Sequence, residues 1–241
     1  MEKPANLVIM HRWDSRLRHP PAGVTPLLRR DASTDPTPSQ LRGPGWRRTS
    51  HGCYVPSVVE LTPGQRVIEG AELLPPGGAV SGWGSAYWRG VRLLDGTMWV
   101  RNDPLLLCLG PTAKIRNRPG VRLSRDRLPP DEVEDVRGVS CTAPLRTAFD
   151  GARLAADGTS AVVFIDMMLT SRLIGLDELR EYIDGCSGWH GVRQARKALG
   201  LAVEGSRSPP ESRLRLVWEL DARLPRPLVN PAVFDRNGRL L

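Results

Sequence analysis

The segment from Ser208 to the last residue, Leu241, constrains the fold of this chain more than any other. Ser208 before Pro209-Pro210 indicates a helix start, because Ser caps a helix and Pro fits its first turn. The apolar residues that follow have close to a helical period: Leu214, Leu216, Val217 and Leu220. Residues 228–241 then predict a β-hairpin, since Asn237-Gly238 is a strong turn signal. The second strand only begins before Leu241, so we expect the start of a sheet without its completion.

The chain is basic, and nearly all of its positive charge comes from arginine. Its net charge at pH 7 is +8, and its 34 basic residues include only three lysines, Lys3, Lys114 and Lys197. A coding sequence rich in G and C encodes arginine at positions where another encodes lysine, and this accounts for the high ratio of arginine to lysine. It does not account for the positive balance. That balance favours an anionic partner, and arginine pairs bidentately with phosphate.

The cysteines and the apolar runs bear on the compartment. The four cysteines lie dozens of residues apart with no CxxC pair: Cys53, Cys108, Cys141 and Cys186. Such spacing predicts neither a zinc site nor a disulfide framework, so free thiols are expected. No apolar run approaches the roughly 20 residues that span a bilayer. We therefore expect a soluble, cytoplasmic protein without a membrane partner.

The front of the chain changes character near residue 37. Residues 1–36 are rich in Pro and Arg and predict a disordered, mostly extended basic tail. Thr37 before Pro38 favours one helical turn over 37–42. Residues 46–55 predict two short strands that turn at His51-Gly52.

The middle is expected to mix helices and strands. Thr62-Pro63 opens a helix to about Leu74, and residues 80–90 predict another with Trp83, Tyr87 and Trp88 on its apolar face, in the core. Apolar runs between Pro, Gly and Asp predict strands at 98–100, 105–109, 121–124 and 133–139. Helices are expected after that at 142–154, 159–171, 176–184 and 189–203, with a hinge at 205–210.

Five stretches in order carry a resemblance to a known family. They are Gln40 to Val55, Ala79 to Trp88, Thr142 to Asp150, Trp189 to Arg196, and Ser208 to Arg215. With them, the chain resembles a large group of uncharacterised bacterial proteins with two parts. The front half is similar to the winged-helix antitoxin of AbiE-type (type IV) toxin–antitoxin systems. The back half is similar to the very-short-patch-repair endonucleases of the PD-(D/E)xK superfamily.

The resemblance implies a metal-dependent nuclease site in the complete form of the family. Several carboxylates would hold Mg²⁺, which lowers the pKa of a bound water and neutralises charge on the scissile phosphate. Only Glu211 maps onto that acidic set, so it is the candidate catalytic and metal-binding residue. An acid in the first turn of a helix also simply stabilises the helix dipole, and that reading stays open. The front half departs from the family too, with a Pro-rich tail where helices of the winged module usually lie.

The candidates for nucleic-acid binding lie in two places. Arg47 and Arg48 follow Trp46 on the expected hairpin, where arginines contact phosphates and an indole stacks on a base. A solvated strand face with Trp46 in the core is the alternative. Arg193, Arg196 and Lys197 form one basic stripe on the helix after Trp189, which either meets DNA or faces solvent. Two further arginines, Arg213 and Arg215, have two interpretations: contact with phosphate, or a pair between Arg215 and Glu219 at i+4, which is favoured.

Together these features predict an α+β chain. A basic tail (1–36) precedes a winged-helix or β-ribbon, β-rich antitoxin-like region with a mixed α/β middle (37–140). A helical region (141–205) and the incomplete start of a PD-(D/E)xK-like core (206–241) follow. The predicted function is DNA association by a relative of very-short-patch-repair endonucleases. We expect the chain to be catalytically incomplete and without bound Mg²⁺. The missing acids would come from a partner chain or from reading frame beyond Leu241. The alternatives are a non-enzymatic antitoxin-like DNA-binding or regulatory protein, and a gene fragment with no stable role.

Overall fold

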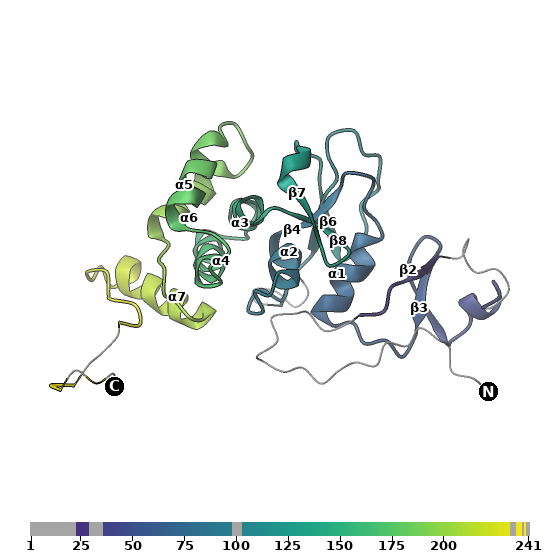
Figure 1. Ribbon diagram of the computed structural model, residues 1–241, viewed down its shortest axis with the longest axis horizontal. Coiled ribbons are helices and arrows are strands. Elements are labelled where there is room, and N and C mark those ends of the chain that lie inside the picture. Colours follow the sequence, from purple (N-terminus) through teal and green to yellow (C-terminus); the bar gives the residue numbers. More distant parts are fainter. Residues whose placement is uncertain (1–22, 29–35, 98–102, 232–234, 238, 240–241) are drawn as a thin grey trace. The chain divides into compact units, whose positions relative to one another are not determined.

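A computed structural model describes residues 23–28, 36–97, 103–231, 235–237 and 239. The chain combines helices and strands, as predicted, in two compact units that divide between Ala143 and Pro144 (Figure 1). Unit 1 holds all the described strands, and unit 2 is helical. The predicted strand at 98–100 and most of the predicted tail lie outside the described residues.

Unit 1 begins with a small antiparallel sheet in the order β1-β3-β2. The hairpin predicted at 46–55 is confirmed as β2 (Trp46–Ser50) and β3 (Cys53–Pro56), with a positive φ at Gly52 in the turn. The 3₁₀ helix Gln40–Arg42 precedes it, within the helical turn expected there. Strand β1 (Leu27–Leu28) adds an edge to β3, so part of the predicted tail is an ordered strand.

The second sheet of unit 1 has five strands in the order β6-β5-β4-β8-β7. Its strands are β4 (Ala79–Ser81), β5 (Leu105–Cys108), β6 (Val121–Ser124), β7 (Val133–Val136) and β8 (Val139–Thr142). The central strand β4 pairs antiparallel with β5 and parallel with β8. Every residue of β4 and β5 is buried, as expected of central strands covered on both faces.

Helices α1 (Pro63–Ala71) and α2 (Gly82–Trp88) both pack against the side chain of Leu105 in β5. A β-carbon placed at Gly70 of α1 or at Gly84 of α2 would lie 2.2 Å from the Leu105 side chain. The two helices therefore cover the same face of β5, and glycine at each position permits the close approach. Thr62 caps α1 as predicted, by accepting a hydrogen bond from the Gln65 amide.

Two predictions for this unit need correction. The helix expected from residue 80 begins only at Gly82, because residues 79–81 form the central strand β4. The single strand expected at 133–139 is a hairpin, β7–β8, whose turn residues Arg137 and Gly138 have φ values of 52° and 77°. Positive φ at both central positions is typical of a two-residue hairpin turn. Such turns favour Asn, Asp or Gly at the first position, so Arg137 gave no turn signal in the sequence.

The aromatic residues of α2 are in the core, as predicted. Trp83, Tyr87 and Trp88 are each at most 8% exposed. An arginine guanidinium lies over each ring, with distances to the ring centroid of 4.5, 4.7 and 5.8 Å for Arg66, Arg92 and Arg137 respectively. Arginines of unit 1 thus cover the edges of its core. The four free cysteines are buried, and burial raises the pKa of the Cys141 thiol to about 12.

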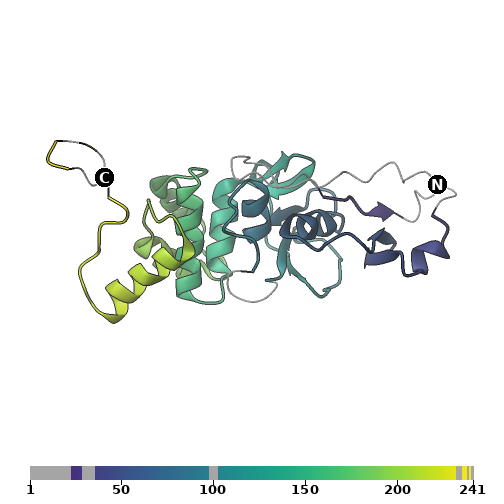
Figure 2. The same cartoon turned by 90° about the horizontal axis from the view of Figure 1, so that it is seen from below.

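Unit 2 consists of helices packed against one another (Figure 2), and one of them contacts three of the others. The helices are α3 (Pro144–Arg153), α4 (Gly158–Thr170), α5 (Leu176–Gly185), α6 (Val192–Leu201) and α7 (Pro209–Leu216), close to the predicted ranges. Helix α4 packs against α3, α6 and α7, and residues 160–169 are all buried. A helix that is apolar all round belongs in a core, and Asp166 is the charged residue in that run.

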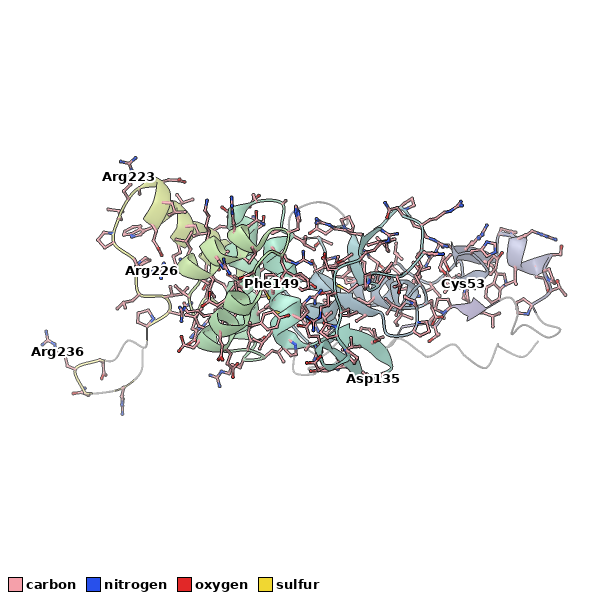
Figure 3. The ribbon with its side chains drawn as sticks, turned by 90° about the horizontal axis from the view of Figure 1, so that it is seen from above. Cys53, Asp135, Phe149, Arg223, Arg226 and Arg236 are labelled. Carbon is pink, nitrogen blue, oxygen red and sulfur yellow. The ribbon has the colours of Figure 1, made fainter. Side chains whose placement is uncertain are left out.

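A buried charge cluster lies where α3 meets the N-terminal end of α6. Asp150 accepts hydrogen bonds from Arg146 at 2.9 Å and from Arg153 at 2.7 Å, and all three side chains are at most 1% exposed. Both guanidinium groups lie over the Trp189 ring, 4.5 and 5.2 Å from its centroid. Phe149, labelled in Figure 3, meets the same ring edge-on at 5.7 Å. Trp189, which begins one of the five stretches that carry the family resemblance, is therefore part of the packing of this unit.

The sheet expected at the C-terminal end of the chain is not formed in its described part. Residues 225–231 contain no strand, although Asp235 makes a turn in which its amide donates to the Arg239 carbonyl at 2.8 Å. The predicted turn at Asn237 is thus present, but residues 228–231 before it do not form a strand. A two-stranded hairpin alone is marginal, which gives the physical reason. Residues 232–234, 238 and 240–241 lie outside the described residues.

Candidate nucleic-acid interface

The hairpin β2–β3 separates the three residues predicted to bind nucleic acid. Side chains alternate between the faces of a strand, so Trp46 and Arg48 share one face and Arg47 lies on the other. The partners of these residues follow the same alternation, since Arg48 is opposite Tyr54 and Arg47 is opposite Val55. Val55 is fully buried, whereas Arg48 is exposed. The face with Arg47 therefore packs inward, and the face with Trp46 and Arg48 is open.

Arg47 is held by a carboxylate of helix α1. Its two terminal nitrogens donate to the two oxygens of Glu69 at 2.9 and 2.6 Å. The hydrogen bond to Glu69 raises the pKa of Arg47. Glu69 also accepts from Gln65, which exchanges two hydrogen bonds with the backbone of Val24. Arg47 thus connects the hairpin to α1.

The open face of the hairpin contains a hollow of about 480 Å³. Trp46, Arg48 and Tyr54 line it from the strands, His51 and Gly52 from the turn, and Leu41 and Arg42 from the 3₁₀ helix. Trp46 and Tyr54 are half-buried, and Arg42, Arg48 and His51 are exposed. We call this feature the hairpin hollow.

Cationic and aromatic groups line the hairpin hollow together. No carboxylate is among the described residues that form it. The Arg48 guanidinium is oriented by hydrogen bonds at 3.0 Å to the Ser50 carbonyl and at 3.0 Å to Nδ1 of His51. Fixed guanidinium groups bind phosphate, and indole and phenol rings offer flat apolar faces. The hairpin hollow can therefore bind an anion that carries a flat ring.

The sequence predicted Trp46 and Arg48 as nucleic-acid contacts, but not the residues that complete the hollow with them. Tyr54 was not detectable, because a regular two-residue turn at His51-Gly52 would place Val55 across from Arg48, and a register shift between Arg48 and Ser50 places Tyr54 there instead. Arg42 and Leu41 were not detectable either, since their approach depends on how the 3₁₀ helix folds back onto β2.

The second group of predicted residues forms an exposed stripe on helix α6. Arg193, Arg196 and Lys197 are all exposed and share one face at i, i+3 and i+4 spacing. Arg196 makes one long hydrogen bond, 3.5 Å, to the Asp184 carbonyl. The stripe is available to a partner of unit 2, but the described pockets of this unit do not include it.

Glu211 is engaged in holding the chain around the start of α7. Its carboxylate accepts from the Arg207 amide at 2.9 Å, from the Ser208 hydroxyl at 3.2 Å and from the Asn230 side chain at 2.7 Å. The hydrogen bonds from Arg207 and Asn230 lower the pKa of Glu211. Glu211 therefore ties the loop before α7 to the segment after it.

Helix α7 is fastened to α4 by a buried polar network. Asp166 accepts from Ser212 at 2.6 Å, from Arg215 at 3.0 Å and from the Val203 amide at 2.8 Å. Arg215 also pairs with Glu219 at 2.9 Å, which confirms the predicted i+4 pair. Burial raises the pKa of Asp166 against these hydrogen bonds. The motif Ser212 to Arg215 thus serves the docking of α7.

Among the described residues, no group of three or more His, Cys, Asp or Glu side chains could hold a metal ion. No helix in the described part of the chain is long and apolar enough to cross a membrane. In comparisons with known proteins, the chain matches no family model, no curated protein and no solved structure.

Proposed function

We propose that the protein associates with DNA through the hairpin hollow of unit 1. The observation that carries the proposal is the composition of the hollow, which Arg42, Arg48 and His51 line together with the rings of Trp46 and Tyr54. Arginines fix a protein on the phosphate backbone, and aromatic rings stack on bases. The net charge of +8 adds a long-range attraction to a polyanion.

The proposed binding has little sequence preference. Sequence is read by side chains that reach base edges in a groove, and the hollow offers phosphate-binding and stacking groups instead. The exposed stripe of Arg193, Arg196 and Lys197 supplies a second, weaker phosphate contact from unit 2. Both contacts depend on charge, so the affinity should fall steeply with salt.

The relationship to very-short-patch-repair endonucleases is part of the proposal. It rests on the ordered motifs of the sequence, from the hairpin to Ser208 and Arg215. In the family form, Glu211 would contribute to an Mg²⁺ site. In this chain we assign Glu211 the role of a structural carboxylate, because its oxygens accept hydrogen bonds from both sides of α7.

The test is a titration of labelled DNA, both as a single strand and as a duplex, followed by fluorescence anisotropy at about 50 mM and about 200 mM salt. We expect binding at the lower salt and a large loss at the higher. Arg48→Gln should weaken binding and reduce the salt slope by about one unit. Arg116→Gln changes an exposed arginine outside the hollow and is the matched control. Absence of binding at the lower salt would refute the proposed function.

A further inference from the structure

The hairpin hollow has a concave shape that a duplex cannot use fully. In double-stranded DNA the flat faces of the bases are stacked on each other, and only phosphates, sugars and base edges reach a protein. Two arginines alone would suffice to contact the phosphates of a duplex. The half-buried rings of Trp46 and Tyr54 beside Arg42 and Arg48 offer flat faces as well.

The register of the hairpin sets the spacing of the two rings. Trp46 is opposite Pro56 and Arg48 is opposite Tyr54, so Trp46 and Tyr54 are diagonal neighbours on the open face. Diagonal neighbours are about 7–8 Å apart, and successive bases of one DNA strand are about 3.4 Å apart. No ring contact joins Trp46 to Tyr54 among the described aromatic pairs. The backbone spacing of the two positions is thus about twice the rise between stacked bases.

The size and charge of the hollow agree with this reading. Its volume of about 480 Å³ lies within the roughly 300–1,000 Å³ of clefts that bind small organic ligands. Arg42 and Arg48 flank the rings, and the Arg48 guanidinium is oriented by Ser50 and His51. A ring-binding surface beside two guanidinium groups matches one nucleotide, with its base against Trp46 and its phosphate against the arginines.

We infer that the hairpin hollow takes an unpaired nucleotide, so the protein binds single-stranded DNA in preference to duplex. This inference rests on the proposed DNA association and names the form of DNA that the same site prefers. Single-stranded RNA offers the same phosphates and flat bases, so it is the alternative ligand that the experiment distinguishes.

The experiment compares the full chain on a single-stranded DNA of about 12 nucleotides, its duplex and the RNA of the same sequence. We expect the single strand to bind at least about 5-fold more tightly than the duplex. Trp46→Ala should weaken single-strand binding by about 5- to 100-fold, as for other stacked bases, and should change duplex binding by about 2-fold or less. Tyr54→Leu provides a second variant of the same wall, and Trp46→Phe should restore most of the affinity.

Trp218→Ala is the matched control, because Trp218 is an indole of unit 2 that is 44% exposed and is not among the residues that line the hairpin hollow. Equal binding of both DNA forms, with equal effects of Trp46→Ala on each, would overturn the inference and leave the proposed function standing. Binding of neither form would overturn both. Binding of RNA alone would overturn the assignment to DNA. Circular dichroism of each variant checks that a loss of affinity is not a loss of fold.

Discussion

Arg47 and Arg48 are neighbours in the sequence with opposite surroundings in the fold. Arg47 is a structural cation held by Glu69, and Arg48 is exposed in the hairpin hollow. The sequence marked both as phosphate contacts, because composition does not reveal which face of a strand is covered. The structural role of Arg47 depends on the placement of α1, which is a tertiary effect.

The two arginines should respond differently to substitution. Arg48→Gln should weaken DNA binding with little effect on unfolding, since the side chain is exposed. Arg47→Gln should leave DNA affinity nearly unchanged and lower the free energy of unfolding by about 1 kcal/mol, the value of a partly exposed ion pair. Anisotropy titration and urea unfolding measure the two effects. A loss of DNA binding in Arg47→Gln without loss of stability would contradict the assignment.

Glu211 predicts a dependence of stability on pH. Its pKa is lowered in the folded state from an ordinary value of 4.5, so its contribution is present above pH 4.5 and is lost as the pH falls through the lowered value. Glu211 is only partly buried, so solvent screening limits the effect: Glu211→Gln should cost about 1 kcal/mol or less near pH 7, and its charge should contribute nothing at the lowest pH. Urea unfolding of both proteins at several pH values measures this difference. A difference that stays constant with pH would argue against the charge of Glu211 as its cause.

At the scale of elements, the sequence predicted best where a cap, a turn residue or a long apolar period is present. Helix α4 follows its Asp157 cap, and strand β6 coincides with the predicted range. Strand β4 was missed because its three residues run directly into α2. The β7–β8 turn was missed because it uses Arg137 with positive φ. Pairing with the distant strands β5 and β8 decides the structure of β4, and local propensity does not contain that information.

The candidate site was predictable only in part for the same reason. Trp46 and Arg48 were identified from residue type and strand position. Arg42 and Tyr54 reach the hollow through folding back and through cross-strand register. The role of Glu211 was open, since the first turn of a helix and a metal site both favour an acid there.

The docking of α7 on α4 gives a prediction at this scale. Asp166→Ala should lower the free energy of unfolding by about 1–3 kcal/mol, because Ser212 and the Val203 amide lose their acceptor while Arg215 keeps Glu219. Asp177→Ala is the control, since this aspartate is 95% exposed in its ion pair and should change stability by about 0.5 kcal/mol or less. Chemical denaturation measures both variants. Equal effects would show that the Asp166 network does not hold α7.

At the scale of the whole molecule, the two units divide the sequence motifs between them. The hairpin hollow belongs to unit 1, and Glu211, Arg215 and the basic stripe belong to unit 2. These motifs therefore serve different purposes: the hairpin hollow and the basic stripe are proposed to contact DNA, whereas Glu211 and Arg215 hold α7 in place.

The chain as it stands should bind DNA without cleaving it. A metal-dependent nuclease needs several carboxylates around one ion, and the oxygens of Glu211 accept hydrogen bonds from Arg207, Ser208 and Asn230. Incubation with supercoiled plasmid and Mg²⁺ or Mn²⁺ should leave the plasmid intact. Nicking that disappears in Glu211→Ala would show instead that Glu211 acts in catalysis. Nicking that persists in that variant would place the activity elsewhere or in a contaminant.

The position of β4 in the sheet has a consequence for the order of folding during synthesis. One neighbour of β4 is β8, and Ser81 of the first bonds to Thr142 of the second across 61 residues of sequence. Until β8 leaves the ribosome, one edge of the most buried strand has no partner, and such an edge invites pairing with other chains. Unit 1 can close only when its last residues emerge, whereas the helices of unit 2 form from local contacts. The nascent chain is therefore most exposed to misassembly just before unit 2 begins.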